Sequence, residues 1–170
     1  VHGIPTSVAF KEGDVISLDC GAYLNGYHGD VAYTVVLGEV SAPVMDLCVS
    51  TKKSLYLAID QAIQGNRLGD IGFAVQNYIE KEKKFGVVRE LVGHGIGKEL
   101  HEAPDVSNYG KRGNGLLLHE GMVFAIEPMV NLGTRQIKTL SDNWTIVSKD
   151  GKPSAHYEHT IVVRKQKAEI

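Results

Sequence analysis

The segment SLDCGAYLNGYHGDVAYT, residues 17–34, constrains the fold more than any other part of the chain. It contains two alternating runs of apolar and polar residues on either side of Asn25-Gly26. Asn-Gly strongly favours a two-residue hairpin turn, because both central residues of that turn need a positive φ. The sequence therefore predicts a β-hairpin over roughly residues 14–38.

The register of this hairpin brings two acidic residues together. With the turn at Asn-Gly, Gly21 lies opposite Asp30. Asp19 is then a diagonal neighbour of Asp30 on the same face, and the backbones of these two residues are roughly 7–8 Å apart. The pair is either two hydrated acids on an exposed face or two carboxylates directed at one ligand. Apolar neighbours such as Cys20 and Val31 predict a hairpin that is covered on both faces, which favours the second interpretation.

Length and composition exclude several classes of protein. The 170 residues, with 18 basic and 20 acidic side chains, fit one catalytic domain over residues 1–170. No basic run indicates nucleic-acid binding, and no apolar run approaches the ~20 residues of a membrane span. Cys20 and Cys48 are too few for a disulfide framework and suit a reducing compartment. We expect a monomeric cytoplasmic protein, and because the chain starts at Val1 we also expect sequence upstream of it.

Beyond the hairpin, the sequence predicts two helices and then a series of short strands. Ser41 can cap the first helix and Gly65-Asn66 can end it. Asp70 can cap the second helix, which runs to about Lys84. The short apolar segments that follow are 88–93, 121–131, 136–140, 143–148 and 155–164. This order of strands, helices and further strands indicates an α+β fold with an antiparallel or mixed sheet.

Glycines surround His94 in the segment GHGIGKE, residues 93–99. The segment matches neither nucleotide-binding fingerprint, because it lacks both G-x-G-x-x-G and a Gly-Lys-Ser/Thr ending. Flanking glycines remove side chains around the imidazole and allow one ring nitrogen to face a cavity, although a histidine in a glycine-rich turn also serves structural roles. His101-Glu102 is not part of H-E-x-x-H, which excludes a zincin helix.

Two further acidic residues occur in apolar segments that read as buried strands. Glu127 lies in GMVFAIEPMV and Glu158 in SAHYEHTIVV, and neither segment contains a basic partner. Because an isolated buried charge is costly, a bound cation would supply the missing charge. Four carboxylates can balance two divalent ions, and oxygen-rich ligation with one imidazole suits Mn, Fe, Co or Zn. The candidate ligands are Asp19, Asp30, His94, Glu127 and Glu158.

Several motifs in a fixed order carry a family resemblance. They are HGIP, LD-x10-D with HGD at its end, GHGIG-x3-HE, F-x-IEPM and SAHYEHT. Over nearly its whole length the chain resembles a type I methionine aminopeptidase of the pita-bread fold, apparently without the N-terminal part of that fold. The resemblance implies a curved sheet covered by helices. It also implies a metalloaminopeptidase that removes the N-terminal methionine from nascent proteins and peptides. The sequence leaves open whether the ribosome is a further partner.

The resemblance also implies roles for individual residues. Glu127 would act as the general base, and His2 and His101 would contact the substrate. Trp144 would help to line the methionine pocket, where Leu100 replaces an aromatic residue found in many members. The residues that would ligate two divalent ions (Co, Mn, Fe or Zn) are the five candidate ligands Asp19, Asp30, His94, Glu127 and Glu158.

Related functions remain open alternatives. X-Pro peptidases share the fold and similar ligands, but they usually carry EPG where this chain has Glu127-Pro128-Met129, and an acidic residue where it has His159. A truncated inactive homologue, or a relative without metals that serves as a binding module, is the other alternative. Type II methionine aminopeptidases are excluded, because they carry a long insertion between the His and Glu motifs.

Overall fold

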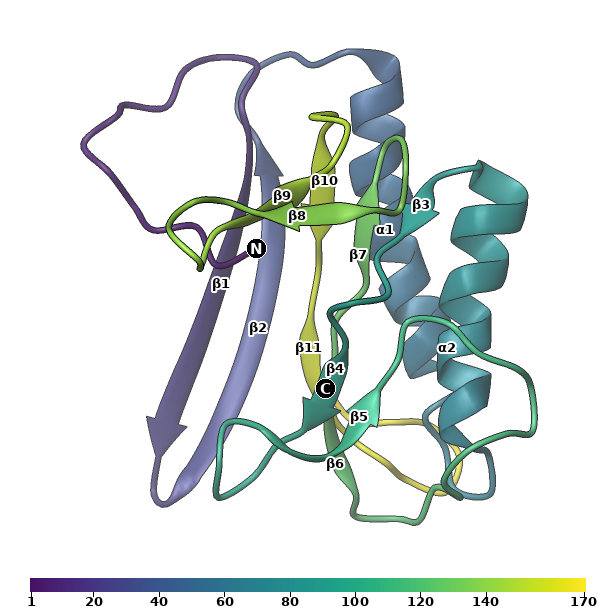
Figure 1. Cartoon of the computed structure of the whole chain (residues 1–170). Coiled ribbons are helices and arrows are strands. Elements are labelled where there is room, and N and C mark those ends of the chain that lie inside the picture. The colour runs from purple at the N-terminus through teal and green to yellow at the C-terminus, as the bar shows by residue number, and fades with distance from the viewer.

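The computed structural model describes residues 1–170 and combines a long hairpin, two helices and several small sheets (Figure 1). The helices are α1 (Ala42–Ile59) and α2 (Leu68–Gln76), which continues into the π-helical segment η1 (Asn77–Lys83). The strands are β1 (Val15–Leu24), β2 (Tyr27–Val36), β3 (Gly86–Val87), β4 (Gly93–Gly95), β5 (Glu102–Val106), β6 (Val123–Ile126), β7 (Met129–Asn131), β8 (Ile137–Thr139), β9 (Ile146–Ser148), β10 (Ser154–His156) and β11 (His159–Val162).

Strands β1 and β2 form the predicted hairpin. Asn25 and Gly26 occupy its turn with φ values of 52° and 88°. The register pairs Gly21 with Asp30, as the sequence predicts. Asp19 and Asp30 therefore share one face of the hairpin, because Asp19 lies two residues from Gly21.

The hairpin is not covered on both faces, contrary to the expectation from its apolar residues. Residues 17–24 of β1 are exposed, and Leu18 and Leu24 keep 57% and 73% of their accessible surface. The helices lie on the far side of the other sheets and do not cover β1 (Figure 1). The hairpin joins these sheets through β2, where the Glu158 N–H donates a hydrogen bond of 2.9 Å to the Ala32 carbonyl.

The other strands form small sheets in which every strand pairing is antiparallel. The strand orders are β11-β6-β4-β5, β10-β7-β3 and β8-β9. The predicted strand over 88–93 is wrong for most of its length, because β3 ends before it and β4 begins at its last residue. The mixed α+β content matches the prediction, but several short sheets replace one continuous sheet.

Two predicted strands are each divided in two by an acidic residue. Segment 121–131 becomes β6 and β7, and segment 155–164 becomes β10 and β11. The sequence had indicated that Glu127 and Glu158 lie within strands. In the structure, both residues lie in the gaps between these strands. Beside Glu127, Pro128 interrupts the ladder because it has no backbone N–H to donate.

The first helix is shorter than the sequence predicts, and the second begins earlier than predicted and becomes π-helical after Gln76. Helix α1 ends at Ile59, ahead of the predicted stop at Gly65, and α2 begins at Leu68. Asp70 does not precede the helix but lies in its first turn, where its carboxylate accepts a hydrogen bond of 2.8 Å from the Arg67 N–H. An acid at this position also interacts favourably with the helix dipole. No helix has the length and apolar character needed to cross a membrane.

The main core lies between the helices and the sheets, with α1 against β10, β7 and β6 (Figure 1). It contains 21 buried residues, and Phe124, Leu47 and Leu55 are among its largest fully buried side chains. This apolar packing holds β6, β7, β10 and β11 in place. It therefore also positions the two gaps that contain Glu127 and Glu158.

The hairpin turn generates a stability prediction. Gly26→Ala is expected to lower the free energy of unfolding by roughly 1–2 kcal/mol, because an L-residue is strained at a left-handed φ. Gly29→Ala in the same hairpin is the matched control. An added Cβ meets open space at both positions, but only Gly26 has a positive φ. Urea denaturation of the two variants measures the difference, and equal losses would contradict the assigned turn.

Candidate metal centre

All five candidate ligands line one cavity of about 440 Å³. Asp19 and Asp30 come from the hairpin, His94 from β4, and Glu127 and Glu158 from the two strand gaps. No lysine or arginine lines this cavity, so no basic side chain neutralises its carboxylates there. We call it the acidic cavity.

The ligand atoms in the acidic cavity form two adjoining clusters. One atom each from Asp30, His94 and Glu158 lie within 4.8 Å of one another, and the same holds for Glu127, His156 and Glu158. Glu158 belongs to both clusters. Asp19 lines the same cavity but belongs to neither cluster.

Glycines on both sides of His94 allow β4 to lie close to its neighbours. A Cβ atom at Gly93 would collide with the Ala125 carbonyl of β6, and one at Gly95 with the Ala103 carbonyl of β5. The buried His94 ring has its Nδ1 atom 3.0 Å from the Gly95 carbonyl oxygen. A carbonyl only accepts hydrogen bonds, so Nδ1 carries the proton and Nε2 remains free to act as a ligand.

Glu158 is the most deeply buried carboxylate of the centre, with 1% of its surface exposed. Its Oε1 atom has no hydrogen-bond partner. Burial, and after it the negative charges of Glu127, Asp30 and Asp19, raise the pKa of Glu158 to about 9. A buried carboxylate with an unpartnered oxygen and acidic neighbours fits a site for a divalent cation, which would take the place of the proton.

Asp30 is fixed by the neighbouring strand. Its backbone N–H donates to the Thr160 hydroxyl at 2.8 Å, and the same hydroxyl donates to the Asp30 carbonyl at 2.9 Å. Burial, and next the charge of Asp19, raise the pKa of the Asp30 carboxyl, while a hydrogen bond from the Val31 N–H opposes this shift. The pKa values of Asp30 and Glu158 are thus both raised by burial first and then by the negative charges of neighbouring acids.

Two of the predicted substrate-contact residues, His101 and His2, line the acidic cavity, but Leu100 does not. His101 lines the acidic cavity, and its ring centroid lies 4.3 Å from that of His94. His2 also lines the cavity and stacks on Trp144 with a centroid distance of 4.8 Å. Leu100 lines neither this cavity nor the larger one beside it, because it packs against the hairpin at Gly21.

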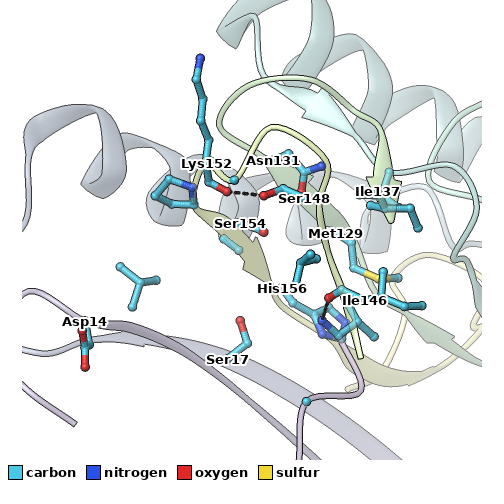
Figure 2. Close-up of a pocket in the computed structure, with 18 of the residues that line it drawn as sticks. Asp14, Ser17, Met129, Asn131, Ile137, Ile146, Ser148, Lys152, Ser154 and His156 are labelled. Atoms are coloured by element: carbon cyan, nitrogen blue, oxygen red, sulfur yellow. Dashed lines mark hydrogen bonds between the residues drawn. The ribbon is translucent and has the colours of Figure 1, made fainter. Parts of the chain in front are cut away.

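The larger cavity, of about 1260 Å³, adjoins the acidic cavity and shares His2, Asp19 and Met129 with it. Figure 2 shows Met129 and Ile146 on the side of the sheets, and Ser17 across the opening from them. The exposed Trp144 and further apolar residues also line it. This cavity has the apolar surface needed to accept an apolar side chain.

His156 is a site residue that the sequence analysis missed. Its Nε2 atom lies 3.2 Å from the Glu127 Oε2 atom, and the histidine is almost fully buried. The motif HYEH, residues 156–159, places it two positions before Glu158, a spacing that puts both residues on one face of a continuous strand. The strand is broken between them, so this spacing alone did not establish the contact.

Comparison with known proteins identifies the family. The sequence matches the model of Metallopeptidase family M24 over residues 1–165. The chain belongs to this family. It is 53% identical over 163 residues to methionine aminopeptidase 1 of Bacillus subtilis, and the match covers 96% of this chain and 65% of that protein. The chain therefore spans about two thirds of the length of this M24 relative.

Solved structures of M24 proteins confirm the predicted pita-bread fold. Methionine aminopeptidase from Rickettsia prowazekii matches with a TM-score of 0.96 and 40% identity, covering 99% of this chain and 68% of that chain. The X-Pro aminopeptidase from Thermotoga maritima matches less well, with a TM-score of 0.74 and 27% identity over 99% of this chain and 42% of that chain. The predicted resemblance to type I methionine aminopeptidases is likewise confirmed.

Membership of a metallopeptidase family agrees with the two ligand clusters of the acidic cavity, which could hold a divalent metal ion.

The pKa of Glu158 generates a prediction about metal uptake. With a pKa of about 9, its carboxyl is protonated near neutral pH and must lose that proton to bind an ion. Calorimetric titration with Mn²⁺ in buffers of different ionisation enthalpy is expected to show release of about one proton per chain near neutral pH. The release should fall toward zero as the pH rises past 9.

The exposed Glu120 provides the control for this measurement, because Glu120→Gln should release the same number of protons. Metal uptake at neutral pH without proton release would contradict the assignment of Glu158 as a ligand.

Proposed function

We propose that the chain carries the catalytic machinery of a methionyl aminopeptidase, a hydrolase that removes N-terminal methionine from peptides and nascent proteins. One observation carries this proposal: Asp30, His94, Glu127 and Glu158 meet in a cavity whose wall also includes His101. Similarity to proteins named methionine aminopeptidase supports methionine as the residue removed.

The proposed cofactor is a pair of divalent ions, Co, Mn, Fe or Zn. Oxygen-rich ligation with one imidazole suits these metals. Glu158 belongs to both clusters and would be one of the residues that hold the ions. When bound, such ions lower the pKa of water toward neutrality and polarise the amide carbonyl. The residues that would hold them are Asp19, Asp30, His94, Glu127 and Glu158.

Protein side chains would perform the proton transfer and charge stabilisation. Glu127 would accept a proton from the attacking water and deliver it to the leaving amine, as a general base and then a general acid. His101 would donate a hydrogen bond to the oxygen that gains negative charge. His2 would hold the amide beyond the cleaved bond. All three residues line the acidic cavity, which supports these roles.

The larger cavity is the proposed location of the methionine side chain. Trp144 and Ile146 line it, and Met129 lies where it joins the acidic cavity. These apolar groups suit an unbranched thioether side chain. Leu100 is not part of this proposed pocket, because it lines neither cavity.

The proposed setting is the cytoplasm, where nascent chains emerge from the ribosome. The free cysteines Cys20 and Cys48 support a reducing compartment. A monomer that acts on peptide N-termini near the ribosome is consistent with removal of the first residue during synthesis.

A peptide assay tests the proposal. With Mn²⁺ or Co²⁺, the chain is expected to release free methionine from Met-Ala-Ser and to leave an Xaa-Pro peptide intact. Glu127→Gln should abolish cleavage and still bind metal, because Gln keeps an oxygen ligand but does not accept the proton. Cleavage of the Xaa-Pro peptide alone would favour the X-Pro peptidase alternative. A metal-loaded chain that cleaves neither peptide would favour the inactive homologue.

The role proposed for His101 has its own test. His101→Ala is expected to lower turnover of the methionyl peptide by roughly 10²–10³-fold with metal still bound, as expected when one oxyanion donor is removed. His119→Ala serves as the control, because His119 is an exposed histidine outside both cavities. Unchanged turnover in metal-loaded His101→Ala protein would remove His101 from the mechanism.

A further inference from the structure

The Glu127 carboxylate lies between two imidazole rings. Its Oε1 atom is 3.6 Å from Nε2 of His94, and its Oε2 atom is 3.2 Å from Nε2 of His156. His94 is one of the candidate metal ligands, whereas His156 is not among the predicted ligands and contacts the other oxygen of the carboxylate. The two oxygens of Glu127 therefore face different partners.

His156 is held in place through its backbone. Its N–H donates to the Thr34 hydroxyl at 2.9 Å, and that hydroxyl donates to the His156 carbonyl at 2.7 Å. The Tyr157 hydroxyl in turn donates to the Thr34 carbonyl at 2.9 Å. Thr34 is buried on β2, so the hairpin and β10 together fix the backbone from which the His156 ring projects.

The His156 ring lies in the wall between the two cavities. It lines the larger cavity, where Figure 2 shows it near Met129 and Ile146, and it does not line the acidic cavity. Glu127 lines the acidic cavity only. His156 thus reaches Glu127 from the larger cavity, and its ring also has a nitrogen within 4.8 Å of a Glu158 oxygen.

We propose that His156 is a positioning residue for Glu127, whose Nε2–H donates to Oε2 and leaves Oε1 directed toward His94 and the metal cluster. An ionised carboxylate only accepts hydrogen bonds, so the imidazole is the donor in this contact. The terminal torsion of a glutamate has a broad energy minimum, so a hydrogen bond is needed to hold the carboxylate in one orientation. Hydrogen-bonding partners of metal ligands commonly have this function.

Metal affinity measures this role without reference to peptide cleavage. His156→Leu fills a similar volume without a donor, and His156→Gln supplies an amide N–H donor in place of Nε2–H. Calorimetry with Mn²⁺ is expected to show a 10–100-fold loss of affinity in His156→Leu, the usual effect of removing such a partner. His156→Gln should recover most of that loss, and His119→Leu should bind Mn²⁺ like the parent chain.

The kinetic readout rests on the proposed aminopeptidase function, and there His156→Leu should lower kcat more than it changes KM. If no variant and no parent protein cleaves the peptide, the metal titration still decides the role of His156. Thermal unfolding of the metal-free variants establishes that each one is folded before titration.

Two results would overturn the proposal. One is parental Mn²⁺ affinity in folded His156→Leu protein, which would show that Glu127 needs no such donor. The other is an equal loss in the Leu and Gln variants, together with a changed visible absorption spectrum of bound Co²⁺ in both. That outcome would make His156 a direct ligand, as its inclusion in the Glu127–His156–Glu158 cluster also allows.

Discussion

The structure of the site depends on a buried negative charge that no protein group balances. Glu158 is almost completely buried, one of its oxygens has no partner, and no lysine or arginine lines the cavity that it shares with the other acids. Burial of an unpaired carboxylate costs several kcal/mol in a real protein, so the group keeps a proton or binds a cation. The raised pKa of Glu158 is the result in the metal-free chain. Glu158 belongs to both ligand clusters, which indicates that a cation replaces this proton in the metal-bound protein.

Irregular parts of the backbone position these carboxylates in the acidic cavity. Glu127 and Glu158 lie in gaps between short strands, and the apolar core under α1 holds those strands. His94 lies on β4 between glycines that permit close approach to β5 and β6. The hairpin adds Asp30, whose backbone N–H and carbonyl both form hydrogen bonds with the Thr160 hydroxyl of β11. Regular sheet supplies the rigidity, and its interruptions direct the acidic side chains into the cavity.

Local rules predicted the turn and the register of the hairpin, because Asn25-Gly26 specifies the turn and a period of two then specifies the register. They also identified Glu127 and Glu158 as acids in apolar surroundings. The rules as applied did not reveal the gaps in the two strands. The missing N–H of Pro128 was a local signal for the first gap, whereas the second gap depends on the hydrogen bond between Glu158 and Ala32 of the hairpin. Nor did they reveal that β1 is exposed, because an apolar pattern does not state which element covers it. His156 escaped notice because its contact with Glu127 joins segments far apart in the sequence.

The acidic cavity is assigned as a divalent metal centre, and anomalous X-ray diffraction from crystals of the chain soaked in Mn²⁺ tests this assignment. We expect anomalous peaks between the carboxylates of Asp30, Glu127 and Glu158 and the Nε2 atom of His94, with two peaks ~3.5–4 Å apart if both ions bind. Crystals that contain Mn²⁺ only at surface carboxylates, with the Glu158 side chain still without a cation, would contradict it.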